Sequence, residues 1–267
     1  MKYEGVLTKM KTEIGNPIQY YLSFENDEIN VNSLINNTMQ ITFLKQQCLN
    51  CGESRNIYRQ GFCYDCFFKM PQMGEWIIHP ELSTAHLGIE DRDLEYEKDV
   101  QLKPHVVYLA LSSNVKVGVT RKTQVPTRWI DQGASSALEI VEAPNRYIAG
   151  ITEVALKKHI PDKTNWRKML KNEIADIDLV ELRDELAEYI PKEVSPYFNE
   201  SNTKVVELDY PVLQYPEKVK SLNIGKVRSF EGILKGIKGQ YLIFEDSTVF
   251  NVRSNEGNVV SLSAVTE

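Results

Sequence analysis

Four cysteines, arranged in two pairs, have the most clearly defined chemistry in this sequence. Cys48 and Cys51 form one Cys-x-x-Cys pair, Cys63 and Cys66 form the second, and eleven residues separate the pairs. Two such pairs can bring four thiolates to one tetrahedral point, which is the geometry that zinc requires. Because a closed four-thiolate site leaves no open coordination position, the spacing predicts a structural zinc ion and not a catalytic one.

Two alternatives compete with zinc at these cysteines. A disulfide is disfavoured in a cytoplasmic chain, and a redox pair is disfavoured because the motifs lie outside a βαβ pattern. Aromatic and basic side chains surround the cysteines, namely Arg55, Tyr58, Arg59, Phe62, Tyr64, Phe67 and Phe68. Such side chains can stack nucleic-acid bases, but the interpretation that we favour is the small core of a zinc ribbon.

A second group of chemically capable residues lies in a central stretch with a regular order of expected elements. Residues 105–111 and 115–120 read as two strands of a hairpin, and 137–141 as a third strand. A short helix is expected within 125–133, because proline suits its first turn and glycine its end. Asn145 is expected to cap a longer helix. Its apolar face would consist of Ile148, Ile151, Val154 and Ala155.

The order strand, strand, helix, strand, helix carries side chains that resemble those of the GIY-YIG endonucleases. Tyr108 falls where the tyrosine of "GIY" falls, and Lys116-Val-Gly118 falls where "YIG" falls. Arg128 lies ten residues beyond that glycine, on the short helix, as the family's arginine does. Glu153 lies on the next helix, in the place of the family's metal-binding glutamate, and Asn165 follows it by twelve residues.

The resemblance implies hydrolysis of a phosphodiester bond with one divalent metal. Glu153 would bind Mg²⁺ or Mn²⁺, Tyr108 or a neighbouring group would activate water, and Arg128 would stabilise the phosphoryl group. Lys116 replaces the second tyrosine, and Gln132 stands where many members have histidine or tyrosine. Lys116 could bind phosphate, or act as a base if burial lowered its pKa. Equally, the departures could mean a degenerate site that only binds.

Each candidate residue also has a simpler interpretation. Tyr108 could be a core aromatic residue, and Glu153 could pair with Lys157 four residues along the helix. Arg128 could pair with Asp131 on the helix surface, and Asn165 could cap the next helix. Taken together, in this order and on these elements, the residues predict a shared phosphate-facing site.

The charge distribution favours a nucleic-acid partner more than the net charge does. The chain has a formal charge of −6, but residues 105–171 contain eleven Lys and Arg against five Asp and Glu, a net +6 that leaves −12 elsewhere. A basic island in an acidic chain is typical of a phosphate-facing module, although a solvated helix face is the simpler alternative. The nucleic-acid-binding candidates are Arg121, Lys122, Arg128, Lys157, Arg167 and Lys168. The sequence does not choose between DNA and RNA.

The two ends of the chain echo one another. Glu4-Gly-Val-Leu7 resembles Glu231-Gly-Ile-Leu234, and Tyr21-Leu-Ser-Phe-Glu25 resembles Tyr241-Leu-Ile-Phe-Glu245. We interpret this as a duplicated small β-unit, with one copy at each end. Because three or four strands are near the minimum for independent stability, the copies are expected to pack or pair together.

Several longer sequence motifs make the whole chain similar to an uncharacterised family, domain of unknown function 2797. They lie at 116–121, 126–134, 164–167 and 236–242, and they imply no function. The expected fold class is α+β with several modules. These are an N-terminal β-unit (1–45), a four-cysteine zinc ribbon (46–72), a linker (73–104), a GIY-YIG-like domain (105–175), an amphipathic helix (176–192), an extended connection (193–226) and a C-terminal β-unit (227–267).

Composition adds only broad limits. The hydrophobic content of 42% and charged content of 25% are ordinary for a soluble protein, and no run is long and apolar enough to suggest a membrane span. A cytoplasmic location without a membrane partner is therefore expected. Two functions remain open. One is a zinc-containing nucleic-acid-binding protein and possible metal-dependent endonuclease, and the other is a non-catalytic scaffold for a protein partner, suggested by the acidic remainder and the helix around 179–189.

Overall fold

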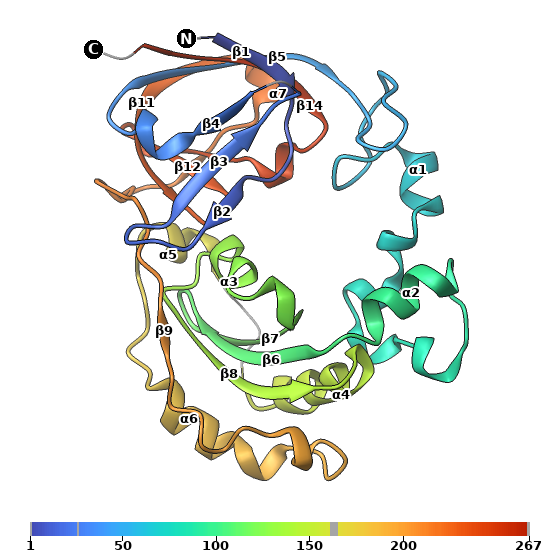
Figure 1. Cartoon of the computed structure of the whole chain (residues 1–267). Coiled ribbons are helices and arrows are strands. Elements are labelled where there is room, and N and C mark those ends of the chain that lie inside the picture. Colours follow the sequence, from blue (N-terminus) through green and yellow to red (C-terminus); the bar gives the residue numbers. More distant parts are fainter. Residues whose placement is uncertain (1, 26, 161–164, 266–267) are drawn as a thin grey trace. The chain divides into compact units, whose positions relative to one another are not determined.

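The computed structural model describes residues 2–25, 27–160 and 165–265, which belong to two compact units (Figure 1). Unit 1 combines Met1–Phe68 with Asp209–Glu267, and unit 2 is Lys69–Leu208. Both contain strands and helical segments, which confirms a mixed α+β protein with several sheets. In the part of the chain that is described, no helix is both long and apolar enough to cross a membrane.

Unit 1 is built mainly from a seven-stranded sheet of order β1-β14-β5-β11-β12-β13-β10. A second sheet has the order β2-β3-β4. The strands of the larger sheet are β1 Lys2–Val6, β5 Thr38–Gln46, β10 Lys220–Ser221, β11 Ser229–Lys238, β12 Tyr241–Phe244, β13 Thr248–Asn251 and β14 Asn258–Val265; those of the smaller are β2 Lys11–Glu13, β3 Gln19–Ser23 and β4 Glu28–Asn30. The helical segments are η1 Val31–Leu34, α1 Tyr64–Lys69, α7 Ile224–Val227 and η9 Arg253–Asn255.

Strands from the two ends of the chain pair with one another in this sheet. β1 pairs antiparallel with β14 through Gly5↔Val260, and β11 pairs antiparallel with β5 through Gly232↔Met39. β5 and β14 also pair antiparallel along most of their length. The first strand of each copy therefore joins the last strand of the other, which confirms that the terminal segments pair. Figure 1 accordingly shows the N- and C-terminal strands together in this sheet.

Equivalent positions of the two copies make equivalent contacts. A Cβ on Gly5 would lie 2.7 Å from the ring of Phe24, and one on Gly232 would lie 3.3 Å from the ring of Phe244. In each copy the third short strand is followed by a 3₁₀ turn that begins near an asparagine, Asn30 or Asn251, and then by the long last strand. In each copy the glycine, which has no Cβ, leaves room for a buried phenylalanine ring.

Unit 2 contains a four-stranded sheet of order β7-β6-β8-β9 with helices on both faces (Figure 1). Its strands are β6 His105–Leu111, β7 Val115–Arg121, β8 Ser136–Ala143 and β9 Val206–Glu207. Its α-helices are α2 Leu94–Gln101, α3 Thr127–Asp131, α4 Arg146–Lys157, α5 Trp166–Leu170 and α6 Leu179–Leu186. Its 3₁₀ turns are η2 Pro71–Met73, η3 Glu75–Ile77, η4 Pro80–Leu82, η5 Ala85–Leu87, η6 Lys122–Gln124, η7 Ala187–Tyr189 and η8 Ser195–Tyr197.

The predicted order strand, strand, helix, strand, helix is confirmed for this unit. β6 is buried along its whole length because both of its faces are covered. Its odd-numbered side chains, such as Leu109, join a core with residues of α4 and α6, whereas Tyr108 on the other face packs edge-on against Trp129 of α3 at 5.8 Å. The Asn145 side chain accepts a hydrogen bond from Ile148 N, which confirms the predicted cap of α4.

The structure corrects the predicted apolar face of α4. Val154 is exposed, whereas Ala149, Gly150, Thr152, Glu153 and Leu156 are buried. Ile148 and Ile151 pack against the core as predicted, so the departure is at Val154, while Ala149 and Leu156 complete the face that packs on the core. Ile148 and Ile151 are only partly buried, at the edge of the core.

The segment predicted as a linker, 73–104, is an ordered part of unit 2. It forms η3, η4, η5 and α2, and it buries Trp76, Ala85 and Val100. Its weak periodicity has a physical reason: short 3₁₀ turns have no repeating apolar face. The predicted connection 193–226 is likewise divided, since β9 pairs with β8 in unit 2 and the chain from Asp209 belongs to unit 1.

The matched glycines of the two copies give a test of the paired architecture. Gly5→Ala should lower the free energy of unfolding of unit 1 by about 1–2 kcal/mol, because its methyl would overlap the Phe24 ring. Gly232→Ala should cost less, because its nearest ring atoms lie at 3.0 Å and beyond. Urea denaturation followed by far-UV circular dichroism measures this change.

Gly225→Ala is the matched control in unit 1. The nearest atom to its added Cβ is 3.5 Å away and the residue lies in α7, so alanine should be neutral or slightly stabilising. All three tryptophans, Trp76, Trp129 and Trp166, belong to unit 2, so tryptophan fluorescence reports that unit separately. Equal effects of the three alanines would contradict the proposed Gly–Phe packing.

Candidate functional site

The four cysteines come together at one point of unit 1. The sulfur atoms of Cys48, Cys51, Cys63 and Cys66 all lie within 4.8 Å of one another, and the four residues are free of disulfides. Four sulfurs at about 2.3 Å from one zinc ion would lie roughly 3.8 Å apart. The cluster therefore fits a tetrahedral ion such as zinc, with each thiolate as one ligand.

Tight turns and N–H donors prepare the cluster for a metal. Gly52 and Gly61 adopt φ values of +70° and +78°, in the left-handed region that favours glycine. Cys63 N donates to Cys48 Sγ at 3.3 Å, and the Asn50 side chain donates to Cys66 Sγ at 3.3 Å. Burial would raise the pKa of Cys48, but backbone N–H groups directed at its sulfur lower that pKa to about 6. The thiolate form that binds metal is thus favoured.

The aromatic side chains around the cysteines are not the buried core that we expected. Tyr58 is 43%, Tyr64 62% and Phe68 49% exposed. They touch one another and Phe67 in a connected cluster, with ring centroids between 4.8 and 5.8 Å apart. The cysteine segment, residues 48–68, is too short to bury these rings, and its Ile57 side chain packs beside Gly257, immediately before β14.

In unit 2, Gly118 and Gln132 contact the Tyr108 phenol. Tyr108 pairs across the hairpin with Gly118, and a Cβ on Gly118 would lie 2.6 Å from the phenol oxygen. The Tyr108 hydroxyl donates to Gln132 Oε1 at 3.3 Å or accepts from Gln132 Nε2 at 3.1 Å. Because Gly118 has no side chain, the Tyr108 ring can occupy the space beside it.

The electrostatic surroundings of Tyr108 place Arg128 and Glu153 nearby. Burial raises the pKa of the Tyr108 phenol, the Arg128 guanidinium and the Gln132 amide oppose that rise, and the Glu153 carboxylate adds to it. Since Tyr108 is fully buried and its pKa is above the ordinary value, it is a neutral hydrogen-bonding group at pH 7. In this neutral form its hydroxyl can donate or accept a hydrogen bond, as it does with Gln132.

Glu153 is buried and paired. Its carboxylate lies 3.2 Å from Lys157 Nζ, so the simpler interpretation of an i,i+4 ion pair holds in this structure. A single carboxylate fits Mg²⁺ or Mn²⁺ only in the mode in which water and substrate supply the other ligands. Among the described residues, the cysteines form the one group of three or more His, Cys, Asp or Glu side chains that could hold an ion.

Arg146 is a further charged residue near Glu153 and Arg128. From the sequence it counted only as one of the cations of residues 105–171. Its guanidinium donates to the carbonyls of Trp76 and Ile77 at 3.0 and 2.8 Å and lies over the Trp76 ring. Burial lowers its pKa to about 10, an effect opposed by Glu153 and reinforced by Arg128 and Arg121. Its position immediately after the Asn145 cap could have indicated a special role, because the first turn of a helix usually favours acidic residues.

Of the remaining candidates, Lys116 lies on the same sheet face as Tyr108, whereas Asn165 makes its contacts elsewhere. Lys116 pairs with Ala110, two residues from Gly118 on the same strand, so it lies on the Tyr108 face of the sheet. Asn165 caps α5 by accepting from Arg167 N and Lys168 N, and its own N–H donates to Ser113 in the β6–β7 turn. No recorded contact joins Asn165 to Tyr108 or Glu153 in the described part of the chain.

The proposed phosphate-binding cations differ in their surroundings. Lys122 forms an ion pair with Glu142 at 2.7 Å, and Arg167 lies over the Trp166 ring at 4.3 Å. Lys168 is exposed, and Arg121 and Arg128 are half-buried. Arg121 and Arg128 are therefore more restricted by their surroundings than Lys122 and Arg167, which lie on the solvated surface.

The space beside Gly150 on α4 is filled by another segment of the chain. A Cβ on Gly150 would lie 2.3 Å from Glu81 N and 2.4 Å from the carbonyl carbon of Pro80. The small residues Ala149 and Gly150 therefore allow η4, and with it the segment 73–104, to pack closely on α4, one turn before Glu153.

A family model described as "Protein of unknown function (DUF2797)" matches residues 36–260. The chain belongs to this family. No curated protein and no solved structure matches the chain. The family match extends from just before β5 to the first residues of β14 and so spans the cysteine cluster, the whole of unit 2 and strands β5, β10, β11, β12 and β13 of unit 1. It brings no assigned activity to any of these parts.

The cysteine cluster gives the first test of the site. The purified protein should contain one zinc per chain, and Cys51→Ser or Cys63→Ser should abolish stoichiometric zinc, because three thiolates leave the tetrahedron open. Asn50→Ala is the matched control, since it removes a single hydrogen bond to a cysteine sulfur and should retain the metal. Elemental analysis by mass spectrometry measures the content, and full zinc in both serine variants would contradict the site.

The Tyr108–Gly118 contact gives a second test. Gly118→Ala should destabilise unit 2 by about 1–3 kcal/mol, because the methyl overlaps the phenol ring. In a Tyr108→Leu background the same change should cost much less, because the overlapping ring atoms are absent. Urea unfolding followed by tryptophan fluorescence yields the coupling energy of this double-mutant cycle, and strictly additive costs would show that the two residues do not share the space.

Proposed function

We propose that this protein binds nucleic acid, with a phosphate group held in unit 2 by Arg128 and its neighbours and with zinc as a structural ion in unit 1. The observation that carries the proposal is the gathering of Arg121, Arg128 and Arg146 around Glu153 and Tyr108. Three guanidinium groups against two carboxylates, Glu153 and Glu81, leave an excess of positive charge, which an anion would neutralise.

The positions of these arginines suit the binding of a phosphate group. Arg146 is fixed by two carbonyl acceptors and by the Trp76 ring, so it contributes a permanent positive field from within the unit. Arg128 is half-buried on the short helix α3, from which its planar group can reach outward to two phosphate oxygens. The net +6 of residues 105–171 would attract a strand to the same unit.

We further propose that the site is a divergent GIY-YIG-like centre that cleaves a phosphodiester. Glu153 would hold Mg²⁺ or Mn²⁺, and the ion would polarise a phosphoryl oxygen. The Glu153–Lys157 ion pair would have to open for this to occur. Tyr108 would orient groups through its neutral hydroxyl, and Lys116, on the same sheet face, would contact phosphate.

The exposed rings of the cysteine segment support a single-stranded partner. Tyr58, Tyr64 and Phe68 present aromatic surface to solvent, and Arg59 lies over the Tyr58 ring at 5.3 Å. Unpaired bases stack on such rings with little sequence preference. A folded duplex exposes few base faces, so these rings favour single strands or loops.

A protein partner is the second candidate function, and one observation favours it. Ile78 is 70% and Leu87 64% exposed on the segment 75–89, where Leu82 and Ile89 are also exposed. The helix α6, which we expected as an interface, does not add to this surface, because Leu179 and Leu186 are buried in the core of unit 2.

Binding of short single- and double-stranded DNA and RNA, measured by fluorescence anisotropy at two salt concentrations, tests the proposal. Wild-type protein should bind at least one strand in a salt-sensitive manner. Arg128→Ala should weaken that binding by roughly tenfold or more, as expected for loss of a charge-assisted contact. Lys192→Ala removes the same charge from an exposed position outside the cluster and should have little effect.

Cleavage is tested separately with Mg²⁺ and Mn²⁺. Glu153→Gln keeps the shape of the side chain, so it should abolish metal-dependent cleavage and retain binding. Binding without cleavage in the wild type would restrict the function to recognition. Absence of salt-sensitive binding to every strand would overturn the proposal and direct attention to a protein partner.

A further inference from the structure

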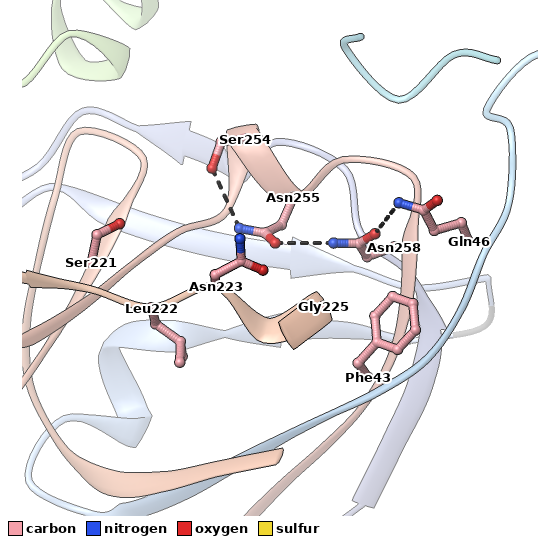
Figure 2. A pocket seen from close by; sticks show the side chains of 9 residues that line it. All are labelled: Phe43, Gln46, Ser221, Leu222, Asn223, Gly225, Ser254, Asn255 and Asn258. Atoms are coloured by element: carbon pink, nitrogen blue, oxygen red, sulfur yellow. Dashed lines mark hydrogen bonds between the residues drawn. The ribbon is translucent and has the colours of Figure 1, made fainter. Parts of the chain in front are cut away.

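Unit 1 contains a pocket of about 460 Å³ that none of the residues discussed above explains. It lies among the end of β5, the turn before α7, and the η9 turn that leads into β14 (Figure 2). Its volume is within the range of small-molecule sites. The lining includes four side-chain amides and one aromatic ring, but no ionisable side chain.

The amides are already ordered in a row by their own hydrogen bonds. Gln46 Nε2 donates to Asn258 Oδ1 at 3.2 Å, Asn258 Nδ2 donates to Asn255 Oδ1 at 3.0 Å, and Asn255 Nδ2 donates to Ser254 Oγ at 3.4 Å. Figure 2 shows this row together with Phe43, which borders the same pocket. Asn255 Nδ2 also donates to the Asn251 carbonyl at 2.8 Å, so both of its donors are used. An amide nitrogen has two donors and an amide oxygen two acceptor positions, so Gln46 and Asn258 retain a second donor beyond these bonds, and the Asn255 oxygen a second acceptor position. A ligand would thus meet oriented polar groups, at a small entropic cost.

Asn223 and Phe43 supply two further kinds of contact. The Asn223 carbonyl oxygen accepts from Lys226 N at 3.1 Å, which fixes its side chain at the start of α7. The Phe43 ring is held by the Arg228 guanidinium, 4.8 Å from its centroid. The pocket therefore combines fixed amide groups with a flat apolar surface.

We propose that this pocket binds a single unpaired nucleobase. The edge of a base presents alternating donors and acceptors, which asparagine and glutamine amides match, and its face packs on aromatic rings. A carboxylate or a phosphate inside the pocket would lack a charged partner and lose its hydration. The uncharged lining therefore selects a neutral polar ring.

The surroundings of the pocket distinguish a nucleobase from a neutral sugar. Lys226 adjoins Gly225, Arg253 adjoins Ser254, and Arg228 contacts Phe43; all three cations are exposed. A phosphate attached to the bound nucleoside would remain outside the pocket, where these cations can meet it. A neutral sugar has no group that would use them.

The cysteine segment fixes one wall of the pocket. Gln46 Oε1 accepts from Ile57 N at 3.2 Å, and Ile57 belongs to the loop between the two cysteine pairs. Because the oxygen of Gln46 is used there, its nitrogen is the atom directed at Asn258. The cysteine cluster thus orients the first amide of the row.

The inference deepens the proposed function and rests on it for the source of the base, a nucleic-acid strand. Phosphate contacts position a strand, whereas base contacts give specificity. The chemistry of the pocket would equally accept a free nucleoside. Free nucleosides therefore test the pocket alone, and strands test its source.

Isothermal titration calorimetry of the zinc-loaded full chain with adenosine, guanosine, cytidine and uridine is the experiment. At least one nucleoside should bind with a Kd of roughly 0.1 mM, with little salt dependence because it is uncharged. Glucose, as a neutral polyol, should not bind. The 5′-monophosphate of the preferred nucleoside should bind more tightly at low salt.

Two variants test the pocket itself. Phe43→Leu keeps apolar volume but removes the flat ring, and Asn255→Ala interrupts the row; each should weaken nucleoside binding about tenfold. Zinc content and the unfolding transition of each variant establish that it is folded. If Asn255→Ala fails to fold, Phe43→Leu alone decides. Unchanged affinity in a folded variant, no heat with any nucleoside, or equal binding of glucose would overturn the proposal.

The outcomes for the pocket and for the proposed function can be separated. Nucleoside binding without strand binding would support the pocket as a site for a free nucleoside or nucleotide and would overturn the proposed function. Strand binding without nucleoside binding would overturn the pocket proposal and leave the phosphate site of unit 2 in place.

Discussion

The antiparallel pairing of β5 with β14 is the constraint on which unit 1 depends. Each half of the duplicated unit has too few strands for stability by itself, and the pairing lets the first strand of each half join the last strand of the other. The same two strands position the chemistry. β5 leads directly into Cys48, and Gly257, immediately before β14, packs against Ile57 of the cysteine loop.

In unit 2 the corresponding constraint is the burial of charge beside a buried phenol. Arg146 is held by two carbonyls and a ring, and Glu153 is held by Lys157. A buried charge is tolerated only when it is paired or hydrogen-bonded. The packing of η4 on Gly150 closes one side of this arrangement, so the segment that separates the cysteines from β6 is part of the candidate site.

The sequence predicted several features because they depend on local spacing. The Cys-x-x-Cys pairs have too short a loop to place their sulfurs far apart. The hairpin of β6 and β7, the Asn145 cap and the stop at Gly133, whose φ is +68°, follow from residue preferences that act within a few positions. The pairing of the terminal segments was predictable from the repeated words, since a repeated half-sheet needs a partner. The exposure of Tyr64 and the burial of Arg146 were not, because both depend on what lies opposite.

The sequence by itself therefore determined the candidate cysteine cluster, the order of elements around Tyr108 and the existence of two related β-units. The tertiary structure decided which residues share a site. Arg146 reaches Trp76 and Ile77 across 70 and 69 positions, respectively, and Gln46 reaches Asn258 across 212. Such contacts depend on strand register and on the packing of distant segments, which local spacing does not specify.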